Sequence, residues 1–143
     1  MSIKNCKLVT LPKIGDERGM LSFAESGNHV PFEIKRVFYS YHVPEMKSRG
    51  AHAHKKLEQF ILSLGGSFEV ELDDGREKNR FVMDKPWQGL YVSPMIWTSV
   101  ENFQSTAVCF VLASDVYDES DYYRNYDDFL RAVDKRYWGL TAG

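Results

Sequence analysis

The stretch that decides the fold runs from residue 49 to residue 58 and reads Arg-Gly-Ala-His-Ala-His-Lys-Lys-Leu-Glu. If Ala51 to His54 form a strand, the period of two places His52 and His54 side by side on one face. Two neighbouring imidazoles can hold a metal ion, or act as a base and its partner in proton transfer. They can also be a hydrogen-bonded part of the core, so the pair alone does not decide between structure and chemistry.

The chain around this stretch predicts many short strands. Turn residues separate segments rich in β-branched and aromatic side chains, and Asp74-Gly75 is the strongest hairpin signal. The expected strands cover residues 6–11, 20–25, 34–41, 51–54, 58–64, 67–72, 80–83, 89–92, 96–100 and 106–113. About ten short strands at nearly even spacing are typical of a sandwich or a barrel.

Only the C-terminal part of the chain predicts a helix. Phe129, Leu130 and Val133 recur at helical spacing, and Asn125 is a suitable N-cap with acidic residues in the following turn. We therefore expect a short helix over about residues 125–134. The expected fold class is all-β with one C-terminal helix, in a single domain spanning residues 1–143.

Composition excludes several classes of protein. The chain has 143 residues, of which 43% are hydrophobic and 14% aromatic, which is sufficient for a buried core. The net charge of −2 argues against non-specific nucleic-acid binding, so no nucleic-acid partner is expected. No apolar run reaches the ~20 residues of a membrane helix, and the first residues lack a signal-peptide core. Cys6 and Cys109 form no disulfide or metal motif, so we expect reduced thiols and a cytoplasmic protein.

Charged residues are unevenly distributed along the chain. Residues 35–56 hold six basic side chains against one acidic one, and residues 115–128 hold six acidic side chains against one basic one. Each run can be a solvated face of the molecule. The basic run also contains the two histidines, so it can instead face an anionic ligand.

The spacing His52-x-His54-x3-Glu58-x6-Gly65 resembles the first signature of the cupin superfamily, whose members are jelly-roll barrels. In metal-dependent cupins the two histidines and the glutamate are ligands, and a second motif supplies another histidine. The segment that resembles this second motif, residues 89–102, carries Thr98 at that position. Threonine is a poor ligand for a transition metal, and we expect no metal, although the other three residues can still form a facial triad. Without a metal, Glu58 is expected to orient a histidine through a hydrogen bond.

Longer segments are similar to the dTDP-4-keto-6-deoxyglucose 3,4-ketoisomerases. They are residues 34–39 (IKRVFY), 49–59 (RGAHAHKKLEQ), 72–75 (LDDG) and 111–122 (VLASDVYDESDY). The resemblance covers about residues 16–129 and implies a cupin-type jelly-roll isomerase acting on a dTDP-linked 4-keto-6-deoxyhexose without a cofactor. Such enzymes serve pathways to 3-amino-3,6-dideoxy sugars for surface polysaccharides, such as lipopolysaccharide O-antigen, or for antibiotics. The resemblance also implies a homodimer that exchanges N-terminal strands.

The implied reaction moves a ketone from C4 to C3 of the hexose through an enediol or enediolate. It requires a base, an acid and hydrogen-bond donors for the developing oxyanion. Histidine suits the base because its usual pKa lies near working pH. We expect His52 to be the base and His54 its partner, and the sequence leaves the two interchangeable.

Four further residues are expected to bind the substrate. Arg49, near the histidines, and Arg18, in the Asp16–Gly19 turn, are candidates for binding the diphosphate. Arg36 is a weaker candidate because its side chain faces opposite Tyr39 on a strand. Tyr39 is a candidate donor to a sugar hydroxyl or to the oxyanion. Each has a structural alternative: a surface charge, a turn-stabilising arginine or a cross-strand aromatic.

Three other functions stay open at this point. They are a metal-dependent cupin enzyme, a non-catalytic sugar-nucleotide-binding cupin, and a 3,5-epimerase acting on the same substrate. The Arg-Gly-x-His-x-His-Lys-Lys context favours the ketoisomerase.

Overall fold

The computed structural model describes the backbone of residues 2–142 and the side chains of residues 2–135. Strands dominate this range, with two 3-10 helices and one α-helix. In chain order the elements are η1 (Ile3–Asn5), β1 (Lys7–Thr10), β2 (Lys13–Asp16), β3 (Gly19–Ser22), β4 (Arg36–Ser40), β5 (Arg49–His54), β6 (Gln59–Gly65), β7 (Phe68–Asp73), β8 (Lys78–Met83), β9 (Gln88–Val92), β10 (Trp97–Glu101), β11 (Val108–Ala113), η2 (Glu119–Asp121), β12 (Tyr122–Tyr123) and α1 (Tyr126–Ala142).

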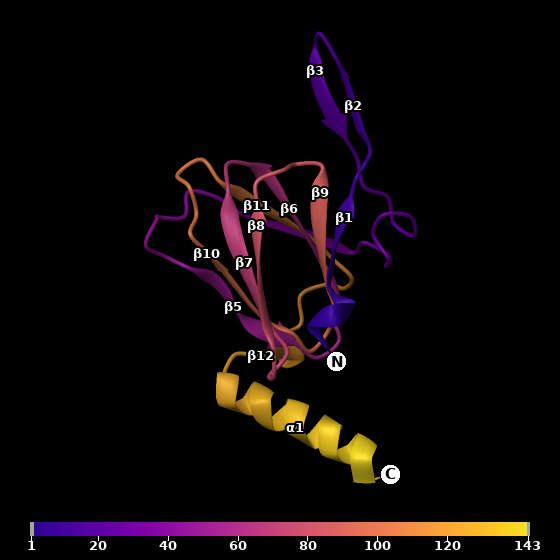
Figure 1. Cartoon of the computed structure of the whole chain (residues 1–143), viewed down its shortest axis with the longest axis vertical. Coiled ribbons are helices and arrows are strands. Elements are labelled where there is room, and N and C mark those ends of the chain that lie inside the picture. Colours follow the sequence, from indigo (N-terminus) through magenta and orange to yellow (C-terminus); the bar gives the residue numbers. More distant parts are fainter. Residues whose placement is uncertain (1, 143) are drawn as a thin grey trace.

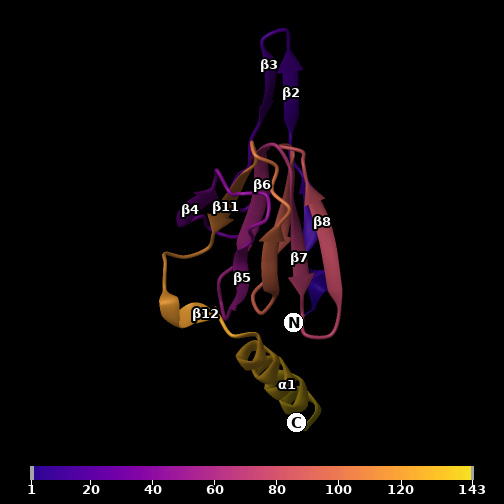
Figure 2. The ribbon, with the colours of Figure 1, turned by 90° about the vertical axis from the view of Figure 1, so that its left-hand side faces the viewer.

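Two five-stranded antiparallel sheets form the body of the molecule. Their strand orders are β1-β9-β6-β11-β4 and β12-β5-β10-β7-β8. Strands β2 and β3 pair only with each other, and their hairpin extends beyond one end of the body, whereas α1 lies at the opposite end (Figure 1, Figure 2). This arrangement is a cupin-type jelly-roll sandwich with a C-terminal helix, which confirms the expected fold class.

The core lies between the facing sheets because alternate residues of each strand point inward. In β7, Phe68, Val70 and Leu72 are completely buried while the residues between them reach solvent. A separate cluster forms where α1 meets the sheets. There Phe129 of α1 packs with Met95 and with Ala53, the residue between the two histidines. The helix therefore supports the strand that carries the histidine pair.

Two glycines allow the turns of the sheets. Gly75 adopts a φ of +92° in the β7–β8 hairpin, which confirms the predicted turn. Gly66 has a φ of +60°, and a Cβ there would lie 2.8 Å from the backbone of Ala107. Any larger residue at either position would strain the backbone, because both φ values lie in the left-handed region.

The structure departs from the predicted elements in three places. Residues 2–142 form twelve strands rather than about ten, because β2 and the two-residue β12 carry little strand signal in the sequence. The helix begins as predicted, with Asn125 Oδ1 accepting the Asp128 amide at 3.1 Å, but it continues to Ala142 rather than ending near residue 134. No proline follows Val133 to end it. Over residues 2–142, no helix is long and apolar enough to cross a membrane.

Candidate active site

His52 and His54 lie side by side near the end of β5, as the strand period predicts. Their ring centroids are 4.8 Å apart, and the rings are nearly perpendicular, at 89°. His54 is almost fully buried, with 3% of its surface exposed, while His52 is half-buried at the wall of a cavity. The two imidazoles are therefore close enough to serve one reacting group.

A carboxylate orients His54. Its Nδ1 lies 3.1 Å from Oδ2 of Asp121 in η2, and the carboxylate oxygens also accept the backbone amides of Lys56, at 2.9 Å, and Leu57, at 3.2 Å. Since an ionised carboxylate can only accept, Nδ1 of His54 carries the proton. Its Nε2 is buried and has no hydrogen-bond partner among the described residues. This leaves the Nε2 lone pair free for a ligand.

Burial keeps both imidazoles neutral. It is the largest cause that lowers the pKa of His52, to about 4, and the charges of His54 and Arg124 lower it further against an opposing effect of Glu119. Burial also lowers the pKa of His54, while the hydrogen bond and charge of Asp121 oppose this shift. Near pH 7 each ring is thus a base rather than a cation.

Tyr122 and Arg124 cover the histidines from the short strand β12 and the residues after it. The Tyr122 ring centroid lies 4.9 Å from that of His52 and 4.3 Å from that of His54. The Arg124 guanidinium lies 4.1 Å from the Tyr122 ring centroid and donates to both oxygens of Glu119, at 2.5 and 2.8 Å. The Tyr117 hydroxyl also donates to Glu119. The histidines are therefore covered by the Tyr122 ring, on which the ion pair of Arg124 and Glu119 stacks.

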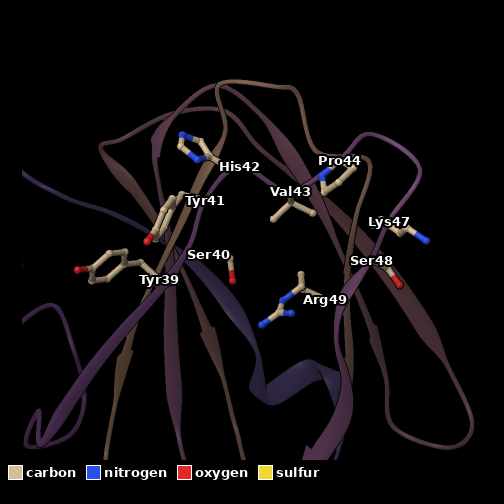
Figure 3. A pocket seen from close by; sticks show the side chains of 9 residues that line it. All are labelled: Tyr39, Ser40, Tyr41, His42, Val43, Pro44, Lys47, Ser48 and Arg49. Carbon is tan, nitrogen blue, oxygen red and sulfur yellow. The ribbon is translucent and has the colours of Figure 1, made fainter.

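A cavity of about 410 Å³ opens from His52 between the sheets. Polar and charged groups among its lining residues are Ser40, Ser48, Arg49, His52, Gln59, Thr98, Tyr122 and Arg124. Figure 3 shows a neighbouring pocket of about 460 Å³, which Tyr39, Tyr41 and Arg49 line and in which the Arg49 guanidinium is directed toward Ser40. The volume of the cavity at His52 is in the range of small-molecule sites, and Arg49 provides a cation at its edge.

Strand β4 presents the opposite face to the one expected for substrate binding. The split into two faces is as predicted, but Arg36, Phe38 and Ser40 are half-buried, whereas Tyr39 is 58% exposed and stacks on Phe110. The structure therefore places Tyr39 outside the cavity that holds His52. Arg36 instead lines a smaller cavity together with His54. Strand alternation identifies two faces but not which one turns inward, which is why the sequence did not predict that Arg36, rather than Tyr39, faces the interior.

Arg18 lies far from the histidines of its own chain. It is at the tip of the β2–β3 hairpin, its side chain is 86% exposed, and it donates to Asp16 at 2.7 Å (Figure 1). Within one chain the structure brings together His52, His54, Arg49 and Arg36, but not Arg18.

The donor set does not fit the metal site of other cupins. Thr98 pairs directly with His52 across β10 and β5, at the place expected for the further histidine, and its Oγ1 donates to the Ile96 carbonyl at 3.3 Å. Glu58 accepts the Tyr91 hydroxyl at 2.6 Å and is absent from the lining of both cavities. Among the described residues no group of three or more His, Cys, Asp or Glu side chains is arranged to hold a metal.

The expected orienting role of Glu58 is therefore wrong, and Asp121 takes it. Asp121, Tyr122 and Arg124 were missed because they lie in the acidic run, which is equally typical of a solvated surface. They lie close to β5 because Tyr122 of β12 pairs with His54 of β5. Strand β12 is too short to be predicted from the sequence.

A jelly roll whose barrel encloses two neutral histidines, one held by an aspartate, defines a cupin-type protein with a site suited to proton transfer. The family model described as "FdtA: WxcM-like, C-terminal" matches residues 4–134, and the chain belongs to this family. A TDP-4-oxo-6-deoxy-alpha-D-glucose-3,4-oxoisomerase from Aneurinibacillus thermoaerophilus is 46% identical over 129 residues, which cover 90% of this chain and 93% of the relative.

Solved structures agree with this assignment. A variant of the 3,4-ketoisomerase QdtA from Thermoanaerobacterium thermosaccharolyticum, in complex with TDP-4-keto-6-deoxyglucose, is 38% identical with a TM-score of 0.90 and covers 92% of this chain and 96% of its own. The TDP-quinovose 3,4-ketoisomerase WlaRB from Campylobacter jejuni is 46% identical with a TM-score of 0.86, over 90% and 99% of the two chains. The chain is thus an isomerase of the 3,4-ketoisomerase class, as predicted.

The epimerases are more distant. The 4-keto-6-deoxy sugar epimerase NovW from Streptomyces spheroides is 16% identical with a TM-score of 0.73, a level of likeness that shows the shared fold alone.

Proposed function

We propose that this chain converts TDP-4-keto-6-deoxyglucose into a TDP-3-keto-6-deoxyhexose, with His54 as the base and His52 as its partner. The observation that carries the proposal is the Asp121–His54 pair, with a free Nε2 beside a second neutral imidazole. The ketoisomerases that the chain resembles over nine-tenths of its length supply the substrate class.

The reaction starts with removal of the C3 proton by Nε2 of His54. The electron pair of the C3–H bond forms the C3–C4 double bond, and the C4 carbonyl oxygen becomes the oxyanion of an enediolate. Asp121 stabilises the imidazolium that forms on His54, because the carboxylate accepts its Nδ1 proton. The O3 proton then passes to O4, the electron pair of the O3–H bond forms the C3 carbonyl, and the electron pair of the C3–C4 double bond takes a proton from the His54 imidazolium at C4. The ketone is thereby transferred, so that C3 is oxidised and C4 is reduced.

His54 is the better base, which reverses the order expected from the sequence. Within residues 2–135, no carboxylate forms a hydrogen bond with His52, and its pKa of about 4 makes the ring a weak base. A neutral His52 ring 4.8 Å away is well placed to pass a proton between O3 and O4 or to hold the enediolate. General acid–base assistance of this kind contributes about 10²–10⁴ in rate.

The nucleotide belongs in the larger cavity. Arg49 and Arg124 line it, and a net negative protein must hold a diphosphate through local cations such as these. Arg124 is paired with the exposed Glu119, so the diphosphate can replace that carboxylate on the guanidinium while water solvates the released Glu119.

A homodimer is the assembly that the surface supports. The free β2–β3 hairpin exposes Ile14, Met20 and Leu21, and an apolar groove of about 570 Å³ lies between this region and the outer face of the β1-β9-β6-β11-β4 sheet. Exposed apolar groups on a hairpin and a neighbouring groove are what strand exchange between two copies would bury. In such a dimer Arg18 would reach the partner's site. The free, buried thiols Cys6 and Cys109 suit a reducing compartment such as the cytoplasm.

The proposed activity is tested with TDP-4-keto-6-deoxyglucose in deuterated water, followed by NMR. Deuterium at C4 together with a new 3-ketone is the expected result. Deuterium at C5 with the ketone still at C4 would identify an epimerase, and no deuterium at any carbon would identify a binding protein. His54→Asn should abolish the exchange while the protein remains folded.

A further inference from the structure

Arg36 is a cation without an anion in the part of the chain that the structure describes. Its Nε is buried and has no hydrogen-bond partner, and no carboxylate of a described residue lies within 4.0 Å of the guanidinium. The guanidinium carbon lies over two aromatic rings, 5.1 Å from the ring centroid of Phe38 and 5.7 Å from that of Tyr117. Lys56, Asp115, Asp118 and Asp121 line the same cavity as Arg36, but none of these carboxylates forms an ion pair with it. Since an unpaired, partly desolvated cation is costly, this environment points to an anion that a ligand supplies.

The same small cavity holds a second unsatisfied group. Arg36 and His54 both line a space of about 180 Å³, and Nε2 of His54 is the other buried polar side-chain atom that has no partner among the described residues. One group is a hydrogen-bond donor with a full positive charge, and the other is a base with a free lone pair. A molecule that satisfies both must present an acidic C–H or O–H beside a negative oxygen.

The size of this cavity separates it from the nucleotide site. At 180 Å³ it is smaller than the 410 Å³ cavity lined by Arg49 and Arg124, and smaller than the ~300–1,000 Å³ typical of ligand pockets. Tyr122 lines both cavities, so they are adjacent. A nucleoside diphosphate does not fit the smaller space, whereas one edge of a sugar ring does.

We propose that Arg36 is a catalytic residue that binds the C4 oxyanion of the enediolate while His54 Nε2 takes the proton from C3. The inference rests on the proposed ketoisomerase function and assigns Arg36 to the reacting edge of the sugar rather than to the diphosphate. When the C3–H electron pair moves into the C3–C4 bond, negative charge collects on O4, the oxygen of the carbon next to the one that His54 deprotonates. A base and a cation that share one cavity match this geometry.

Arg36→Gln tests the proposal, with Arg131→Gln, an exposed arginine of α1, as the control for loss of one positive charge. We expect Arg36→Gln to lower kcat about 10²–10³-fold, as for loss of an oxyanion donor, with KM and the Kd for TDP nearly unchanged. Exchange of the C3 proton in deuterated water should fall by the same factor, and Arg131→Gln should behave like the wild type. Weaker TDP binding with kcat preserved would overturn the proposal, as would an unchanged kcat.

The pH profile distinguishes this role from a structural one. The charge of Arg36 lowers the pKa of His54, so its removal should move the acid limb of kcat/KM to higher pH, and Arg36→Lys should restore much of the original profile. An unmoved acid limb in Arg36→Gln would count against the proposal.

A measurement on the wild type covers the case in which Arg36→Gln does not fold. The NMR signal of the Arg36 Nε–H, assigned with Arg36→Lys, should shift on addition of TDP-4-keto-6-deoxyglucose and stay in place with TDP alone. A shift caused by TDP alone overturns the role of Arg36 and leaves the ketoisomerase proposal intact. Failure of the wild type to exchange any sugar proton would instead overturn the proposed function itself.

Discussion

At the scale of single residues, the site depends on a neutral histidine that gains a proton without losing its position. Asp121 accepts three hydrogen bonds, two from backbone amides and one from His54, so the carboxylate is fixed before any substrate arrives. The imidazolium that forms during the reaction therefore meets a preorganised negative charge. Burial acts in the opposite direction and keeps the resting ring basic.

Asp121→Asn should lower kcat by about 10²–10⁴ while KM changes little, because the amide no longer stabilises the protonated His54. Asp121 raises the pKa of His54, so the acid limb of kcat/KM should move to lower pH in the variant. Steady-state kinetics across pH measure both effects. Asp127→Asn in the first turn of α1 is the control, and an Asp121→Asn enzyme with wild-type kcat would contradict the role of the carboxylate.

His52 makes the stability of the protein depend on pH. Its pKa is about 4 in the folded chain against a usual value of 6.5, so below pH 6.5 the unfolded chain binds a proton that the folded chain does not. The free energy of unfolding should therefore fall as the pH drops from 6.5 toward 4, by about 1–2 kcal/mol at pH 5. Denaturant titrations near pH 7.5 and pH 5 measure this loss. His52→Asn should reduce the difference, and an equal difference in both proteins would refute the assignment.

The residue types of the site were predictable from the sequence, but their neighbours were not. His52, His54 and Arg49 follow from one continuous stretch whose strand period is unambiguous. The prediction that Glu58, in the same stretch, orients a histidine is wrong. The carboxylate that does so belongs to Asp121, and spacing along a strand says nothing about a side chain 67 residues away. Arg36 was placed on the correct strand face, but which face of β4 turns inward is decided by the packing of the whole sheet.

At the scale of elements, the site is completed by a short strand held between β5 and α1. Strand β12 has two residues, and its pairing with His54 and Ala53 brings Tyr122 onto the histidines. Two residues give no periodicity, so the sequence could not predict this strand, whereas the long strands and the start of α1 were predicted correctly. The position of β12 depends instead on the packing of the helix beneath it.

Phe129→Ala should reveal this dependence. The ring is completely buried and contacts Ala53, Met95 and Tyr123, so its loss should cost about 3–5 kcal/mol of unfolding free energy. Activity should fall even under conditions where the variant is still folded, because Ala53 separates the two histidines on β5. Denaturant unfolding and kcat at low temperature measure the two effects. The exposed Val116→Ala is the control and should change stability by less than about 0.5 kcal/mol.

At the scale of the whole molecule, a single chain exposes apolar side chains to solvent and leaves Arg18, an expected substrate-binding residue, away from the site. The β2–β3 hairpin, which carries Arg18 in its turn, pairs with no strand of either five-stranded sheet (Figure 1, Figure 2). Tyr39 and Tyr41, which lie outside the cavity that His52 lines, are each 58% exposed on the outer side of β4. A second copy that covers this face would explain both features, and it would give Tyr39 a role in assembly rather than in catalysis.

Subunit complementation tests whether Arg18 acts across such a dimer. Arg18→Gln and His54→Asn homodimers should each be strongly impaired, because every site in them lacks one required group. In a mixed dimer, the protomer with Arg18→Gln keeps its own His54 and receives the intact Arg18 of its partner, so one site of the two regains full function. Co-expression with two affinity tags isolates the mixed dimer, and its kcat per dimer should be about half that of the wild type. If Arg18 acts within its own chain, the mixed dimer contains no complete site and recovers nothing beyond the average of the two homodimers.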